Sequence, residues 1–109
     1  MGTVAVQAPR HLSKRTAKLY RRLVTDYRLD DEAHALEILR LAAEAIDRCT
    51  EAREAIAKDG PFIEDRFGQL RCHPGVQVER DSRLAALRAL RELSLDGAAP
   101  DDVRPPRLN

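Results

Sequence analysis

Aromatic residues, cysteines and long apolar runs are scarce in this sequence. Its 109 residues include no Trp, two Phe and two Tyr, so a core must be built mainly from Leu, Ile, Val and Ala. The two cysteines, Cys49 and Cys72, are too few and too far apart for a metal-binding motif, and we expect both to be reduced thiols. Because a small domain buries a limited share of its surface, we expect this one to gain stability from a partner.

Signatures of catalysis, cofactor binding and membrane insertion are absent as well. The sequence contains no Gly-rich phosphate-binding loop and no HExxH or CxxC pattern, and its histidines, His11, His34 and His73, are far apart. No apolar run approaches the ~20 residues that a membrane-spanning helix needs. We therefore expect no enzyme activity, no catalytic residue, no metal or cofactor site and no membrane insertion.

The central stretch, residues 31–59, has the strongest helical pattern. It contains no Gly or Pro, and we expect Asp30 or Asp31 to cap its start and Gly60 to end it. Its apolar residues recur at steps of three and four and form a stripe of Leu36, Leu39, Ala43, Ile46, Cys49 and Ile56. We predict that this stripe packs against copies of the same helix, because so long a helix exceeds what a small chain can cover. The simpler alternative is an ordinary core helix of a single bundle.

The opposite side of this predicted helix is charged. It carries Glu37, Arg40, Glu44, Asp47, Arg48, Glu51, Glu54 and Lys58. Several of these lie three or four positions apart and are expected to pair, such as Arg40 with Glu44. Carboxylates that alternate with Lys and Arg are typical of a solvated, salt-bridged face and not of a general acid–base pair.

Two shorter helices are predicted on either side of the long one. Ser13 is expected to cap a first helix over residues 14–27, and Pro74 to open a third helix that ends near Leu93. The apolar side of the first comprises Leu12, Thr16, Leu19, Tyr20, Leu23, Val24 and Tyr27. The apolar residues of the third are Val76, Leu84, Leu87, Leu90 and Leu93. Residues 61–74 indicate a small hairpin-like loop that leans on the helices.

We therefore predict a mostly α fold and an oligomeric protein. It is a three-helix domain with one long central helix and a small hairpin-like loop between the second and third helices. Residues 1–12 are expected to form a flexible arm, residues 13–95 the single helical domain, and residues 96–109 an extended tail rich in proline.

Charge is divided unevenly along the chain, although the formal net charge is only +1. Residues 10–28 carry seven Lys or Arg and one acid, whereas residues 30–65 carry eleven acids and four basic residues. Clustered basic residues bind the phosphates of duplex DNA, so we predict DNA contacts by Arg10, Lys14, Arg15, Lys18, Arg21 and Arg22. Tyr20 and Tyr27 are expected to face inward, which disfavours stacking on single-stranded bases. Alternatively, the basic helix docks on the acidic long helix or on an acidic protein.

The order of these parts resembles the phage terminase small subunit family over about residues 10–107. The resemblance rests on the segment from Gly60 through His73-Pro74 to Leu95, followed by the run from Arg104 to Arg107. It implies a non-enzymatic DNA-packaging factor, of a kind also found in gene-transfer particles. Such a factor forms a ring-shaped homo-oligomer, engages double-stranded viral DNA and recruits or regulates the large terminase subunit in the cytoplasm of the bacterial host cell.

The resemblance also implies that the tail meets the large subunit, with Arg104, Arg107 and Leu108 as candidate contacts. A different class of function is a helical protein–protein adaptor or an antitoxin-like oligomer that does not bind nucleic acid. Salt-dependent retention on duplex DNA separates the two hypotheses, because phosphate binding weakens steeply as salt rises.

Overall fold

Three helices and one hairpin make up the part of the chain that the structure describes. The computed structural model describes residues 6–93. The order of elements is α1 (Lys14–Tyr27), α2 (Ala33–Asp59), β1 (Phe62–Glu64), β2 (Leu70–Cys72) and α3 (Pro74–Leu93). The predicted mostly α fold is confirmed, with its long central helix and the hairpin between the second and third helices. Oligomerisation stays a prediction.

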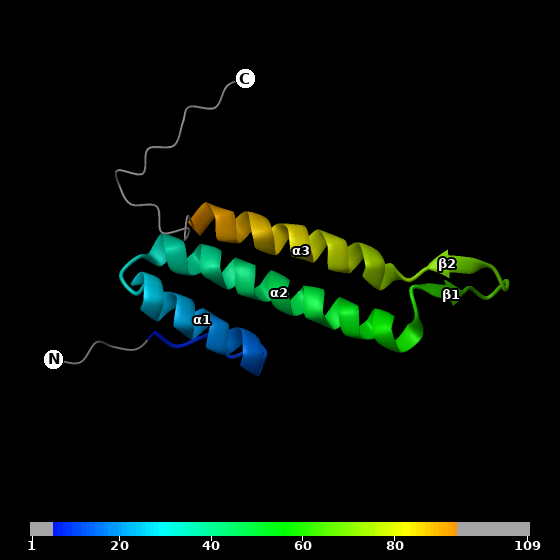
Figure 1. The fold of residues 1–109 in the computed structure, drawn as a ribbon, viewed down its shortest axis with the longest axis horizontal. Coiled ribbons are helices and arrows are strands. Elements are labelled where there is room, and N and C mark those ends of the chain that lie inside the picture. Colours follow the sequence, from blue (N-terminus) through cyan, green and yellow to red (C-terminus); the bar gives the residue numbers. More distant parts are fainter. Residues whose placement is uncertain (1–5, 94–109) are drawn as a thin grey trace, which may run out of the picture.

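The helices form a single layer. In Figure 1, α2 lies between α1 and α3. The molecule extends only 18 Å along its shortest axis, and a helix with its side chains is about 10–12 Å across. Stable domains usually consist of two packed layers, but residues 6–93 supply no second layer for either face of this one.

Local capping signals set the ends of α1. The Ser13 hydroxyl accepts a hydrogen bond from the Thr16 backbone N–H at 3.2 Å, as predicted for an N-cap. At the other end Arg28 adopts a left-handed conformation with φ 53°. The next residue, Leu29, donates its backbone N–H to the Val24 carbonyl at 3.0 Å and is buried. The chain is thereby turned back towards α2.

The start of α2 differs from the prediction, and its end agrees with it. The N-cap position is Glu32, whose side chain makes no capping hydrogen bond, so the expected cap at Asp30 or Asp31 is wrong. The Glu32 backbone N–H donates to the Leu29 carbonyl at 3.0 Å, which places both aspartates in the turn before the helix begins. Gly60 ends the helix with φ 83° and donates its N–H to the Ile56 carbonyl.

The largest apolar cluster lies between α1 and the first half of α2. It consists of Leu12, Tyr20, Val24, Leu29, Ala35, Leu39 and Ala43. Val6 and Ala8 pack against this cluster. Residues 6–12 therefore lie along the domain, in contrast to the free arm that the sequence led us to expect.

The contact between α2 and α3 is made by small residues. Its buried members are Cys49 and Ala52 from α2 with Gly75, Ser82 and Ala86 from α3. Small side chains let two helices approach closely. Leu84 and Leu87, which we placed on the apolar side of the third helix, remain 49% and 56% exposed. Val76, Leu90 and Leu93 are half-buried, and Leu93 packs against the apolar cluster, so the predicted apolar side marks the packed surface of α3 only in part.

The hairpin is confirmed, but its expected support by the helices is not. β1 pairs antiparallel with β2, and Gly68 adopts φ 77° in the connecting turn. The hairpin projects beyond the ends of α2 and α3 (Figure 1), and its large apolar side chains, Phe62, Phe67 and Leu70, are 63–75% exposed. Asp65 stabilises it internally, because its carboxylate accepts hydrogen bonds from the Phe67 and Gln69 backbone and from Arg71.

Candidate nucleic-acid interface

The basic side of α1 faces outward. All six residues that we predicted to contact DNA are exposed: Arg10, Lys14, Arg15, Lys18, Arg21 and Arg22. The opposite side of α1 buries Thr16, Tyr20 and Val24. Because that side packs on α2, the helix cannot rotate to hide its charges without exposing the core. Tyr27, which we expected to face inward, is instead 43% exposed.

Charge pairing does not hold α1 on α2. Arg22 pairs with Asp26 of its own helix at 3.4 Å. Within residues 6–93, no ion pair joins a Lys or Arg of α1 to an acid of α2. The basic helix therefore does dock on the long helix, as the alternative supposed, but through its apolar side and Asp47 and not through its Lys and Arg side chains. The basic side is left available to a partner.

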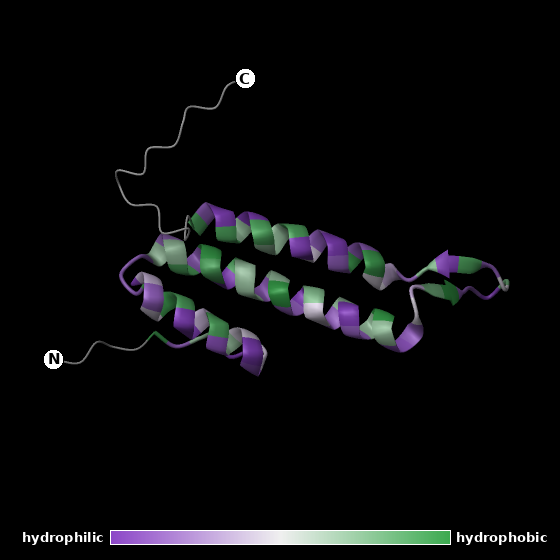
Figure 2. Cartoon of the chain, in the orientation of Figure 1, coloured by the Kyte–Doolittle hydropathy of each residue, from purple (hydrophilic) through white to green (hydrophobic). Residues whose placement is uncertain are grey.

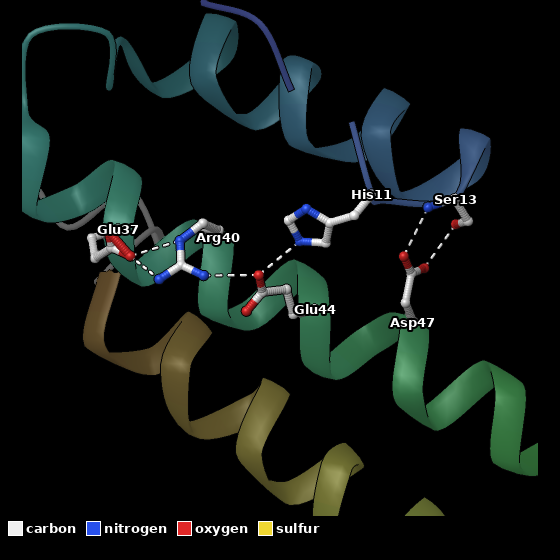
Figure 3. A network of polar contacts seen from close by, with 6 residues as sticks. All are labelled: His11, Ser13, Glu37, Arg40, Glu44 and Asp47. Atoms are coloured by element: carbon white, nitrogen blue, oxygen red, sulfur yellow. Dashed lines mark hydrogen bonds and ion pairs between the residues drawn. The ribbon is translucent and has the colours of Figure 1, made fainter. Parts of the chain in front are cut away.

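A buried carboxylate, Asp47, fixes the N-terminal end of α1 (Figure 3). It is only 7% exposed and accepts hydrogen bonds from the Ser13 N–H at 2.8 Å, the Ser13 hydroxyl at 2.7 Å and the Thr16 hydroxyl at 2.6 Å. Burial alone raises the pKa of Asp47, but these hydrogen bonds outweigh it and hold that pKa below its ordinary value. Asp47 was expected on the solvated side of α2, so this placement is a correction.

A second polar network supports the segment that leads into α1. Arg40 lies between Glu37 and Glu44 on α2, and its Nη1 is 2.8 Å from the Glu44 carboxylate, which confirms the predicted pair. His11 Nε2 is 2.7 Å from the same carboxylate. Burial raises the pKa of Glu44, but the hydrogen bonds from His11 and Arg40 hold it below its ordinary value.

A groove with a volume of about 370 Å³ runs beside α1 and is lined by all three helices. Its apolar lining includes Leu19, Ile46, Cys49, Ala86, Leu87 and Leu90. Three arginines complete it, and two of them, Arg53 and Arg83, share the carboxylate of Glu79 at 2.9 and 3.4 Å. The third, Arg15, makes no ion pair within the described residues. Sequence reasoning missed this groove because it arises only when three separate helices pack together.

The predicted contact stripe between copies is mostly used within the chain. Leu39, Ala43 and Cys49 are buried, and the other members, Leu36, Ile46 and Ile56, are half-buried. The buried three are not accessible to a second copy in this conformation. The predicted contact between copies is therefore corrected for these three residues, because this surface of α2 packs on α1 and α3.

The candidate partner contacts Arg104, Arg107 and Leu108 lie outside the described residues. Across residues 6–93, no cluster of three or more His, Cys, Asp or Glu is placed to hold a metal ion. No helix in that range combines the length and apolar character that crossing a bilayer requires.

Comparisons with protein-family models, with curated proteins and with solved structures found no match to this chain.

Proposed function

We propose that this protein is a small terminase subunit: an oligomeric, non-enzymatic factor that binds double-stranded viral DNA and recruits or regulates the large terminase subunit. The observation that carries the proposal is the outward basic side of α1. Its charges lie on a helix whose rotation is fixed by the apolar cluster and by Asp47. A preformed row of cations presented in this way suits contact with phosphates.

The surroundings of α1 favour duplex over single-stranded DNA. Binding of single strands relies on aromatic side chains that stack on bases. Of the two tyrosines of α1, Tyr20 is buried and not available for stacking, and only Tyr27, the last residue of the helix, is exposed. One aromatic side chain does not form a platform for successive bases. The basic row from Lys14 to Arg22 spans about 12 Å at ~1.5 Å per residue, so one helix can contact more than one phosphate.

Reversing two charges of α1 tests the proposal. In the variant Lys18→Glu with Arg21→Glu, we expect the affinity for a duplex to fall by about tenfold or more, because phosphate contacts become repulsive. Fluorescence anisotropy over a series of salt concentrations measures this change. The wild-type slope of log affinity against log salt should be about −0.9 for each neutralised phosphate and should become shallower in the variant.

A matched control carries the same charge change on α3. Arg80→Glu with Arg88→Glu alters two exposed arginines that lie away from α1 and outside the groove, and it should leave most of the affinity in place. Equal losses in both variants would show a general charge effect. Unchanged binding in the well-folded α1 variant would refute the assignment, and a wild-type protein that binds no duplex would favour a protein adaptor.

The tail is proposed as the element that meets the large subunit. Residues 96–109 include Arg104, Arg107 and Leu108 in a proline-rich sequence, and such segments often order only on a partner. Deleting residues 97–109 should abolish co-purification with the large subunit while leaving duplex affinity unchanged. Co-purification of the truncated chain at unchanged affinity would remove the tail from this role.

A further inference from the structure

One face of the hairpin is an exposed apolar surface with a single acid. Cross-strand partners point to the same side of a two-stranded ribbon, and neighbours along a strand point to opposite sides. The pairs Phe62 with Cys72 and Glu64 with Leu70 therefore share one face. All four residues are exposed, and Glu64 makes no ion pair within residues 6–93.

Among the residues that the structure describes, none covers this face. Figure 2 shows hydrophobic segments in both strands of the hairpin, beyond the ends of the helices. Phe62 and Leu70 are 63% and 71% exposed. Exposed apolar side chains that lie on one face often mark an interaction site. Hydrogen bonds to Asp65 from the Phe67 and Gln69 backbone and from Arg71 hold the hairpin in shape from within.

The groove beside α1 has the complementary chemistry. Its floor is apolar, and Leu19 and Leu87 on its walls are themselves 39% and 56% exposed. Its rim is cationic, and Arg15 is the rim charge that has no partner among residues 6–93. A volume of about 370 Å³ lies within the range of about 300–1,000 Å³ typical of ligand pockets, which are lined mainly by apolar side chains.

The hairpin does not reach the groove of its own chain. Arg53 is the groove residue of α2 nearest to the hairpin, and it lies about 9 Å along the helix axis from Asp59, at ~1.5 Å per residue. From Asp59 the hairpin continues away from the helices (Figure 1). His73 holds its base, because its Nε2 is 3.0 Å from Asp59 and its N–H donates to the Pro61 carbonyl.

We propose that the hairpin face of one copy binds in the groove of a second copy. Phe62 and Leu70 enter the apolar floor, and Glu64 faces Arg15 on the rim. The occupant is a second copy because the same chain carries both surfaces, apolar with apolar and acid with base. A groove placed against another groove would bring arginines together, which opposes association.

The contact is therefore head-to-tail. Each copy offers its hairpin to one neighbour and its groove to another, and such contacts close into rings or extend as filaments. This inference rests on the self-assembly part of the proposed function, and it assigns Arg15 to the contact between copies and not to DNA in the assembled state.

Two double variants test each side of the contact. Phe62→Ser with Leu70→Ser removes the apolar hairpin face, and Leu19→Ser with Leu87→Ser removes apolar walls of the groove. Because all four side chains are at least partly exposed, both variants should fold. Each should raise the dissociation constant for self-association by about tenfold or more, since apolar anchors in pockets dominate interface energies. Leu41→Ser with Val78→Ser changes two exposed apolar residues outside both surfaces and should leave assembly unchanged.

Mixing the two defective variants gives the decisive measurement. The hairpin variant retains an intact groove, and the groove variant retains an intact hairpin. An equimolar mixture should therefore form a one-to-one dimer that grows no further, whereas each variant alone stays monomeric in sedimentation velocity. Circular dichroism confirms folding in every sample.

Each outcome bears on a stated claim. If both double variants assemble as the wild type does, the hairpin–groove contact is overturned, and the proposed assembly stays in place. Monomeric variants whose mixture forms no dimer also overturn it, because the two surfaces then do not meet each other. A folded wild-type protein that sediments as a monomer overturns both the contact and the self-assembly part of the proposed function. The charge-reversal variants of α1 test the DNA-binding part separately.

Discussion

Replacing Asp47 with alanine should lower the free energy of unfolding by about 2–4 kcal/mol, because hydrogen bonds to a charged acceptor contribute about 1.5–3 kcal/mol and buried donors are costly to leave unpaired. The substitution removes the acceptor for the Ser13 N–H and for the hydroxyls of Ser13 and Thr16. All of these donors belong to the beginning of α1. The packing of α1 on α2 should therefore be the first part of the structure to weaken.

Hydrogen exchange locates the effect. In Asp47→Ala, amides of α1 should lose protection more than amides of α2 and α3, since the small-residue contact between those two helices does not involve Asp47. Glu51→Ala is the matched control: it removes an acid of the same helix that is exposed and pairs with Arg48 at 3.3 Å. Its effect should stay within about 0.5 kcal/mol. Equal effects of the two substitutions would contradict the anchoring role of Asp47.

The same carboxylate makes stability depend on pH. Hydrogen bonds hold the pKa of Asp47 below its unfolded value, so its contribution is fully present above the unfolded pKa, at about 4, and is lost as pH falls through the folded pKa. Asp47→Asn preserves the shape but cannot titrate. Unfolding midpoints measured from neutral to acidic pH should therefore fall less steeply in the asparagine variant than in the wild type. Parallel curves would mean that other groups account for the acid sensitivity.

Local sequence signals predicted the elements of the fold well. Ser13, Gly60, Pro74 and Gly68 each act on the backbone within a few residues of their own position. A cap satisfies a helix end, proline restricts φ, and glycine permits positive φ. These effects do not depend on which helices pack together. The bounds of α1 and α3 and the place of the hairpin were therefore accessible from the sequence.

The packing surfaces were less accessible, because helical periodicity indicates one apolar side and not which neighbours cover it. The central helix of a single layer has neighbours on two sides. Accordingly α2 buries Ala35, Ala42 and Ala52 in addition to members of its leucine stripe. Alanine is equally common on exposed helix surfaces, so it carries little signal. For the same reason the leucine spacing could not show that Leu87 is exposed. Its exposure is explained only by the packing of Ala86 and Ser82 on α2, which turns Leu87 outward.

The candidate site was likewise predictable from the sequence only in part. Clustering of Lys and Arg over residues 10–28 marked a basic helix, and the structure places all six predicted residues at the surface. Asp47 was assigned to the solvated side because charge is the usual reason for exposure. Its burial depends on Ser13 and Thr16, which are more than thirty positions away in the sequence. Hydrogen bonds between residues so far apart in the sequence produce no periodic pattern along a helix, so the sequence does not reveal them.

Leu39→Ala should cost about 2–5 kcal/mol of unfolding free energy, because deleting a buried side chain loses its transfer energy and leaves a cavity. Leu39 is 2% exposed and belongs to the cluster that joins α1 to α2. Leu41→Ala provides the matched control, two positions along the same helix, with 51% exposure. It should cost less than about 1 kcal/mol. Urea unfolding at one protein concentration measures both, and the two midpoints should differ clearly while the slopes stay similar. Equal losses would place Leu41 in a buried contact with another chain, since the rest of residues 6–93 leaves too much of it exposed to explain such a cost.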